Sequence, residues 1–171
     1  MIVSEITNKN DEWYTPRNAI YPILKYLKPN STIWCPFDTE NSEYVKLFRE
    51  SGHKVIATHI SNGENFFEVN CPKCDYIISN PPYSLKLEVF KRLFEIGKPF
   101  AMLVGVVGLF DSFGKAELFS ENTFEIMYLN PRVKFINIDG NGKGQPPYQS
   151  AYVCSNILPK QICFERVLKD A

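Results

Sequence analysis

A short apolar stretch that runs into two consecutive prolines constrains this chain more than any other feature. Residues 76–78 (Tyr-Ile-Ile) form a β-type run of the kind found in buried parallel strands. The strand is expected to end at Asn80, because Pro81 and Pro82 have no N–H to donate and a fixed φ angle. The sequence therefore predicts a rigidly held polar side chain at the carboxyl end of a strand, where open α/β sheets bind their ligands.

Stretches of strand type alternate with amphipathic stretches of helix type over the first two thirds of the chain. The expected strands are residues 32–35, 54–60, 75–79 and 99–107, and the expected helices are residues 16–28, 42–51 and 85–96. This alternation predicts an α/β fold with a doubly wound, Rossmann-like, mostly parallel sheet. The strand-rich end of the chain, including residues 133–138, is expected to add an antiparallel hairpin at one edge.

Length and composition indicate one folded domain over residues 1–171, with residues 1–10 as a flexible lead. Hydrophobic content is 44% and charged content is 22%, as in globular rather than disordered chains. The longest apolar stretch, residues 100–107, is too short to span a bilayer, and the N-terminus has no apolar signal core. We therefore expect a cytoplasmic protein without membrane contact.

The formal net charge of zero argues against strong non-specific binding to nucleic acid.

The five cysteines are expected to be reduced thiols, because their number is odd and no export signal precedes them. Cys71 and Cys74 have the spacing of metal ligands. A tetrahedral zinc site needs two more ligands, and the chain has no second pair of this kind. No metal is therefore expected. A plain loop before the strand at residues 75–79 is the favoured interpretation, and a zinc or redox role is the alternative.

The turn from Asn80 to Tyr83 suits transfer of a methyl group to a planar amine. The nitrogen of such an amine is a poor nucleophile while its lone pair is conjugated into a ring or carbonyl. The Asn80 side-chain oxygen and the Pro81 carbonyl can each accept one N–H, which shifts the nitrogen towards tetrahedral character. Pro82 would hold this geometry, and Tyr83 would stack on the ring that carries the amine. The alternative is a structural Pro-Pro turn that Tyr83 caps.

Three motifs carry a resemblance to a known family. Asn80-Pro-Pro-Tyr83 resembles the catalytic motif of amino-methyltransferases that use S-adenosylmethionine. Residues 11–16 (Asp-Glu-Trp-Tyr-Thr-Pro) resemble the opening motif of phage-type DNA N6-adenine methyltransferases, and residues 132–136 and 150–154 resemble their closing strands. The resemblance covers about residues 11–164. It implies the Rossmann-like methyltransferase fold and S-adenosylmethionine as cofactor.

The resemblance also implies which residues hold the methionine end of the cofactor. In this family the segment at Tyr14, Thr15 and Pro16 folds over that end. Thr15 is also expected to cap a helix that begins with Pro16. Pro36 and Phe37 match the start of the family's cofactor turn. The alternative for the first segment is an aromatic lid on the core.

Further along the chain, other positions complete the implied cofactor site. Asp38, or Glu40, can meet the positive amino group of the methionine part. His59 lies at the strand end where the family has an acidic residue for the ribose hydroxyls, and Phe66 lies where the family places an aromatic ring beside the adenine. The alternatives are a strand-end histidine without a ligand and a phenylalanine of the core.

The function has alternatives as well. No glycine occurs from residue 36 to residue 51, although glycines normally let the backbone approach a cofactor closely. This departure favours a catalytically weak remnant of the fold that binds a nucleotide or a partner.

As acceptor, DNA is favoured over an RNA base or a glutamine amide. A protein partner, or the loops at residues 108–114 and 139–149, would recognise the target, and Phe110 and Phe113 are expected to form a second wall of the acceptor pocket.

Overall fold

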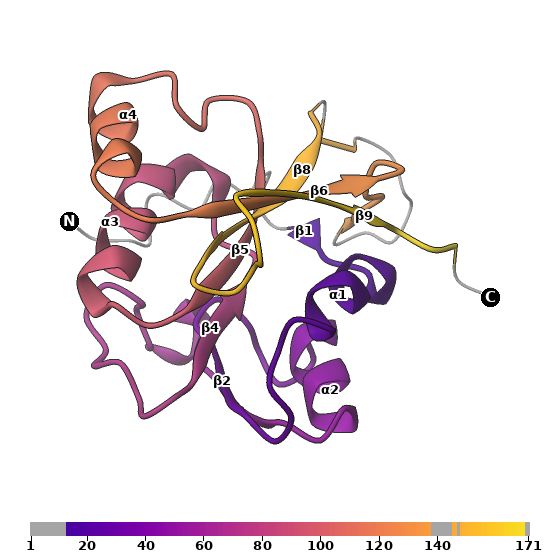
Figure 1. Ribbon diagram of the computed structural model, residues 1–171. Helices are drawn as coiled ribbons and strands as arrows, with labels where there is room; N and C mark the ends of the chain where they lie inside the picture. Colours follow the sequence, from indigo (N-terminus) through magenta and orange to yellow (C-terminus); the bar gives the residue numbers. More distant parts are fainter. Residues whose placement is uncertain (1–12, 138–144, 147, 170–171) are drawn as a thin grey trace.

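A seven-stranded sheet forms the centre of the molecule, and helices cover both of its faces (Figure 1). The structure is a computed structural model that describes residues 13–137, 145–146 and 148–169. The strands, in spatial order, are β3 (Lys54–Ala57), β2 (Thr32–Cys35), β4 (Tyr76–Ser79), β5 (Phe100–Gly105), β8 (Ser150–Ser155), β6 (Glu125–Asn130) and β9 (Ile162–Arg166). Three predictions fall wholly or partly outside the described residues: the flexible lead, residues 11–12 of the opening motif, and residues 139–144 and 147 of the recognition loop.

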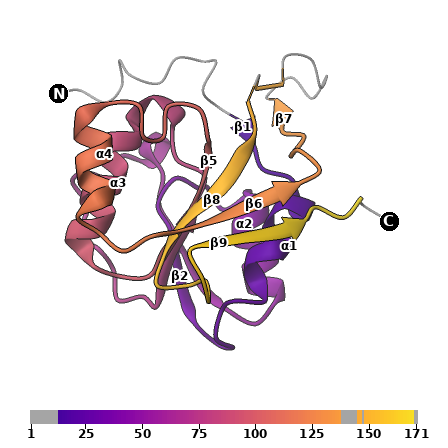
Figure 2. The same cartoon turned by 45° about the horizontal axis from the view of Figure 1, so that its top comes forward.

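Strand β8 is antiparallel to both of its neighbours, β5 and β6, whereas the other pairs of this sheet are parallel. The mostly parallel, Rossmann-like α/β sheet is therefore confirmed. The antiparallel pairing lies inside the sheet and not in an edge hairpin, because β8 inserts between β5 and β6 (Figure 2). Burial explains the order: every residue of β8 is buried, whereas β9 alternates between exposed and more buried residues, as an edge strand with one solvated side does.

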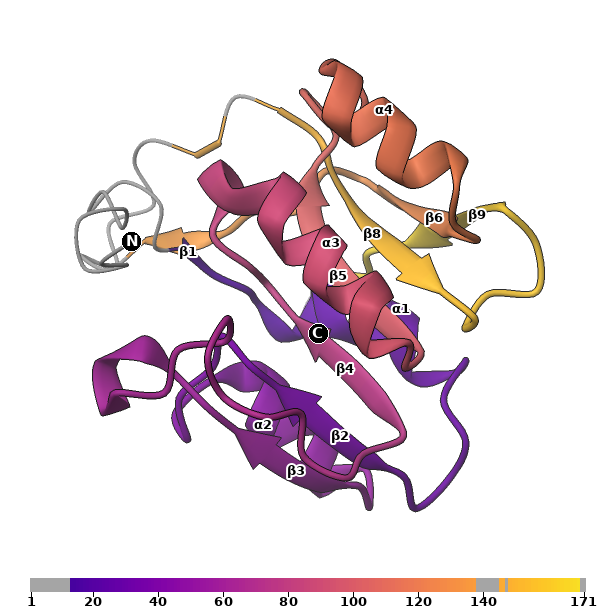
Figure 3. The ribbon, with the colours of Figure 1, turned by 90° about the vertical axis from the view of Figure 1, so that its left-hand side faces the viewer.

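The helices form one layer on each face of the sheet (Figures 1 and 3). They are α1 (Arg17–Leu24) and α2 (Glu43–Glu50) on one face, and α3 (Lys86–Ile96) and α4 (Phe113–Ser120) on the other. Ile78 and Leu103 pack with the first pair, whereas Ile77 and Met102 pack with the second. Covering both faces explains why every residue of β4 and β5 is buried. Within the described residues, no helix has the length and apolar character needed to cross a membrane.

A separate two-stranded sheet joins the start of the described chain to the segment after β6. It pairs β1 (Trp13–Tyr14) with β7 (Ile136–Asn137) in antiparallel register. The strand expected at residues 133–138 is therefore shorter, because only residues 136–137 pair in the described part of the chain. The pairing fixes the path of β1, which leads directly into the functional site.

Helix α1 differs from its predicted limits at both ends. It begins at Arg17, with Pro16 in an extended conformation as the N-cap, and no side chain of the described residues caps it. The predicted cap, Thr15, accepts a hydrogen bond from Asn80 instead. The helix ends at Leu24 rather than at residue 28, because the next backbone N–H groups bond to carbonyls three residues back and close a turn.

Local signals set the limits of α2 correctly. The Ser42 hydroxyl accepts from the Tyr44 N–H at 3.1 Å, and Gly52 follows the helix with a φ of 90°, which favours glycine. After α2, β3 ends at Ala57 and not at residue 60. Residues 60–62 form the short 3₁₀ helix η2 (Ile60–Asn62), which the His59 side chain caps.

Candidate active site

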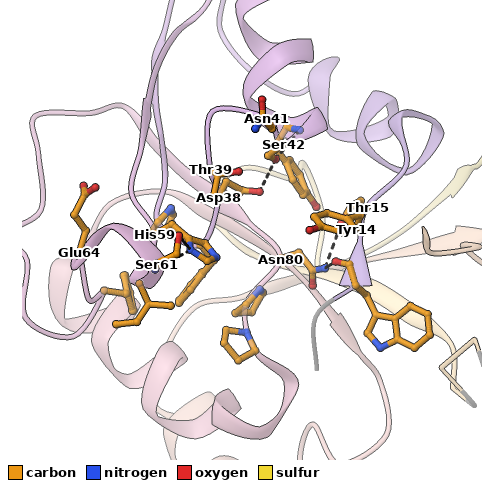
Figure 4. Close-up of a pocket in the computed structure, with 18 of the residues that line it drawn as sticks. Tyr14, Thr15, Asp38, Thr39, Asn41, Ser42, His59, Ser61, Glu64 and Asn80 are labelled. Carbon is orange, nitrogen blue, oxygen red and sulfur yellow. Dashed lines mark hydrogen bonds between the residues drawn. The ribbon is translucent and has the colours of Figure 1, made fainter. Parts of the chain in front are cut away.

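A pocket of about 550 Å³ lies at the carboxyl ends of β2, β3 and β4 (Figure 4). Small-molecule sites in proteins have volumes in this range. Most of the site residues expected from the sequence line this pocket: Tyr14, Thr15, Pro36, Phe37, Asp38, His59, Phe66, Asn80, Pro81 and Pro82. Pro16 and Tyr83 do not belong to its lining.

Asp38 lies in the turn after β2 and is 8% exposed. Its Oδ1 atom accepts from the Ser42 hydroxyl at 2.5 Å, and its Oδ2 atom accepts from the hydroxyl of Ser79 at the end of β4. Burial raises the pKa of the Asp38 carboxyl to about 6, although the two hydrogen bonds oppose that rise. In the described ranges no Lys, Arg or His forms an ion pair with it. The pocket therefore contains a buried carboxylate that has hydroxyl donors and, among the described residues, no counter-ion.

The turn at residues 36–42 needs no glycine. None of its residues, all of which the structure describes, has a positive φ. The Phe37 N–H donates to Ser79 Oγ at 3.3 Å, and the Asp38 N–H donates to the Thr58 carbonyl at 3.2 Å. These donors are used inside the protein, so they do not form the cradle that glycine-rich loops offer to phosphates. The turn suits a ligand that has no phosphate group at this point.

The charged side chains of the pocket are acidic. Asp38, Glu43 and Glu64 line it, and its described lining contains no Lys or Arg. The Glu43 carboxylate is partly neutralised by Arg17 at 2.5 Å. Glu40, the alternative to Asp38, is exposed, pairs with an arginine of α2 and lies outside the lining. The pocket therefore favours a ligand with positive charge and disfavours an anion.

The end of the pocket beyond β3 contains His59, Ser61 and Glu64 (Figure 4). The Ser61 N–H donates to His59 Nδ1 at 3.0 Å, which orients the imidazole. Glu64 provides a carboxylate at the end of the pocket where the sequence offered only His59. Sequence reasoning missed it because Glu64 lies beyond the turn at Asn62 and Gly63, and only the fold of η2 brings it back to the pocket. An acidic residue directly after an Asn-Gly turn was the available signal.

Aromatic side chains close the pocket between β2 and β4. Phe66 is 2% exposed, and its ring centroid lies 4.9 Å from that of Phe37 and 5.6 Å from that of Trp34. Phe67 is half-buried and also lines the pocket. The Asn65 Oδ1 atom accepts from the Phe67 N–H at 3.0 Å and so fixes this turn. Phe66 therefore belongs to the hydrophobic core and also lines the pocket.

Asn80 follows β4 and is held by the N-terminal segment. Its Nδ2 atom donates to the Trp13 carbonyl and to Thr15 Oγ1, both at 3.2 Å (Figure 4). These bonds define which way the amide points, because a carbonyl can only accept. The Asn80 Oδ1 atom is buried and accepts no hydrogen bond from the described residues. Asn80 therefore lines the pocket with a side-chain oxygen that has no hydrogen-bond partner among the described residues.

Hydroxyl groups continue this network from Thr15 to α1. Tyr152 Oη donates to the Ala19 carbonyl at 2.9 Å, so Tyr44 Oη, 2.9 Å away, must donate to Tyr152. Burial raises the pKa of the Tyr44 hydroxyl, and the Thr15 hydroxyl opposes that rise. Thr15 Oγ1 accepts from the amide nitrogen of Asn80. Both tyrosine hydroxyls thus have an assigned donor role, and the Trp13 carbonyl, which can only accept, fixes the orientation of the Asn80 amide.

Tyr83 begins the short 3₁₀ helix η3 (Tyr83–Leu85) and lies outside the pocket lining. Its ring meets Phe135 edge-on at 6.4 Å and Tyr148 at 5.7 Å between centroids. The two residues expected to form the second wall of the acceptor pocket lie elsewhere. The Phe110 ring packs against α4, and Phe113 is 83% exposed. Phe135 and Tyr148, which the sequence did not single out, take the places beside Tyr83.

The Cys71 and Cys74 sulfur atoms lie 4.0 Å apart. Burial raises the pKa of the Cys74 thiol to about 12. In the described part of the chain, no three His, Cys, Asp or Glu side chains are grouped where they could hold a metal ion.

Comparisons with known proteins bear on the fold. No family model matches the sequence, and no curated protein matches it. Among solved structures, the chain is similar to the crystal structure of a modification subunit of a putative type I restriction enzyme from Vibrio vulnificus YJ016, with a TM-score of 0.56 and 14% identity. The match covers 97% of this chain and 49% of that chain, so this chain spans about half its length. At this identity the similarity shows the fold: a Rossmann-like α/β protein, here with a pocket at the carboxyl edge of its sheet.

Proposed function

We propose that this chain is an S-adenosylmethionine-dependent methyltransferase that acts on the N6 amine of adenine in DNA. One observation carries the proposal: an acidic pocket without Lys or Arg among its described residues adjoins Asn80, whose side-chain oxygen is unpaired. S-adenosylmethionine carries a sulfonium, an ammonium and a carboxylate group, so that it is a net cation, and it has no phosphate. Its charge and its lack of phosphates match the pocket, and an amine substrate matches the unpaired acceptor.

The cofactor would be held by residues from each strand end. Asp38 would accept from its ammonium group, and Tyr14 and Thr15 would cover its methionine part. Glu64, with His59, would bond the ribose hydroxyls, as a carboxylate at this strand end does in dinucleotide folds. The aromatic walls around Phe66 would enclose the adenine.

The acceptor amine would donate its two N–H groups to Asn80 Oδ1 and to the Pro81 carbonyl. The prolines fix these acceptors before the substrate arrives, so the protein acts through position and electrostatics. When bound, S-adenosylmethionine supplies the methyl group, and its S–C bond breaks as the new N–C bond forms. The amine nitrogen then releases one proton to water.

DNA as the acceptor is supported by the similarity to a modification subunit of a restriction enzyme. A base in a duplex must leave the stack to reach such a pocket, at a cost of a few kcal/mol. With a net charge of zero, this chain has little general attraction for DNA. We therefore propose that a protein partner contributes target recognition.

Calorimetry tests the cofactor assignment. S-adenosylmethionine and S-adenosylhomocysteine should bind, whereas ATP, a nucleotide with phosphates, should not. Failure of both adenosyl ligands to bind would leave only the weak-remnant interpretation. If they bind, transfer of a labelled methyl group to DNA, RNA and protein pools identifies the acceptor, and labelling of RNA or of glutamine alone would contradict the DNA assignment.

A further inference from the structure

The ring of Tyr148 lies directly on the backbone of β5. A Cβ atom added at Gly105, the last residue of that strand, would be 2.4 Å and 2.5 Å from two carbons of this ring. No larger residue fits there while the ring stays. Glycine near a strand end often marks the close approach of another group. Here the group that approaches is a planar six-membered ring.

A buried hydroxyl lies beside the contact between the Tyr148 ring and Gly105. Ser150 of β8 pairs directly with Gly105 of β5, and the two strands lie side by side (Figure 2). Directly paired residues of antiparallel strands project to the same face of a sheet. Ser150 is 1% exposed, and its Oγ atom has no hydrogen-bond partner in the described ranges. A buried polar group without a partner is unfavourable, so this hydroxyl is suited to a ligand that brings one.

The position that the Tyr148 ring occupies is next to the Asn80–Tyr83 motif. The Tyr148 ring centroid lies 5.7 Å from that of Tyr83, at an interplanar angle of 68°. Lys86 Nζ lies 5.9 Å from the Tyr148 ring centroid and donates to the carbonyl of Val107, just beyond β5. A ring in this place would thus have a cation beside it and the motif's tyrosine next to it.

We infer that the place of the Tyr148 ring is the subsite for the acceptor ring. The acceptor displaces Tyr148 and lies on Gly105, and its ring nitrogen accepts from the Ser150 hydroxyl. This inference rests on the proposed function and adds the residues that recognise its acceptor, an aromatic ring that carries an exocyclic amine, as adenine does. A glutamine amide lacks the ring that this place accommodates, and it has no ring nitrogen for Ser150.

Binding of single-stranded oligo(dA), with oligo(dT) of equal length as the reference, tests the subsite. Fluorescence anisotropy with saturating S-adenosylhomocysteine gives the affinities, and calorimetry reports cofactor binding in the same samples. Tyr148→Ala should strengthen oligo(dA) binding, because the competing ring is gone. Ser150→Ala should weaken oligo(dA) binding about fivefold, because the free energy of one neutral hydrogen bond is lost. Weaker oligo(dA) binding by Tyr148→Ala would overturn the inference, because the ring would then be a wall of the site.

The variant Gly105→Ala tests whether Gly105 leaves room for the acceptor ring or only for the ring of Tyr148. It should weaken oligo(dA) binding tenfold or more, on the order of a steric misfit in a tight site. Gly114→Ala is the matched control, because its Cβ would meet a Leu87 methyl group at an ordinary 3.4 Å. The double variant Gly105→Ala/Tyr148→Ala should stay weak. If it binds oligo(dA) as tightly as Tyr148→Ala, Gly105 serves only to pack Tyr148 and the inference is wrong.

The controls separate this inference from the proposed function. If wild-type protein binds no S-adenosylhomocysteine, the proposed function fails. If it binds that ligand but the Gly105, Tyr148 and Ser150 variants all bind oligo(dA) like wild type, the inference alone is overturned.

Discussion

Asp38 is a carboxylate that folding buries without a counter-ion among the described residues. Its folded pKa of about 6 lies above its ordinary 3.8, so the native state binds the proton more tightly than the unfolded chain. Between these values the free energy of unfolding falls as the pH rises, by about 3 kcal/mol in total. A residue that costs stability at neutral pH is typical of a binding site, where a cationic ligand offsets the cost.

Asp38→Asn should therefore stabilise the protein at neutral pH and remove this decrease between about pH 4 and pH 6. Urea unfolding across this range measures both effects. Asp111→Asn is the control, because Asp111 is 65% exposed and Lys115 lowers its pKa, which gives the opposite sign. Lower stability of Asp38→Asn at pH 7 would show that the carboxylate has a favourable partner in the folded protein.

The same variant should bind S-adenosylmethionine about 10- to 100-fold more weakly, because a charge-assisted hydrogen bond is lost. In the wild type, affinity should rise as the pH rises through about 6, since only the ionised Asp38 attracts the ammonium group. Calorimetry at several pH values checks this. Affinity that does not change with pH in the wild type would place the ammonium group elsewhere.

Asn80→Ala should reduce kcat about 100- to 1000-fold, because one of the two amine acceptors is lost. Cofactor affinity should stay close to that of the wild type. Asn62→Ala is the control, since this asparagine is exposed in η2. Wild-type turnover in Asn80→Ala would refute the role of its side-chain oxygen.

At the scale of elements, one hydroxyl joins β8 to α1 and supports the motif after β4. Tyr152→Phe removes the acceptor of Tyr44 and the donor to Ala19 while keeping the ring. The expected loss of unfolding free energy is about 1–3 kcal/mol. The kcat value should fall less than in Asn80→Ala, because the Trp13 carbonyl still orients the amide.

Chemical denaturation and steady-state kinetics test this pair of effects. Tyr21→Phe is the control, because Tyr21 is 51% exposed on α1. If Tyr152→Phe lost stability without any change in kcat, the network would be structural and would not position Asn80.

For the whole molecule, zero net charge predicts weak, weakly salt-dependent binding to DNA. Duplex DNA binding by the chain alone should show a slope of log K against log salt shallower than about −4, as few phosphate contacts require. Anisotropy titrations at several salt concentrations measure the slope. A steep slope would reveal a basic face that the overall charge conceals and would weaken the argument for a recognition partner.

Local chemistry made part of this structure predictable from the sequence. Two prolines end β4 whatever surrounds them, because they lack N–H groups. Ser42 and Gly52 bound α2 through contacts within a few residues, so their signal is also local. The strand–helix alternation predicted the class of sheet, because parallel strands need covered faces and crossovers.

Tertiary structure alone decided the features that join distant parts of the chain. Thr15 looked like a helix cap, yet it bonds to Asn80, sixty-five positions away. Glu64 reaches the pocket only through the fold of η2, and β8 is buried because it lies between β5 and β6. Tyr148 lies on Gly105 because β5 and β8 pair. Each of these depends on where remote segments meet, which local propensity and spacing do not contain, whereas the proline-ended strand depends on its own residues.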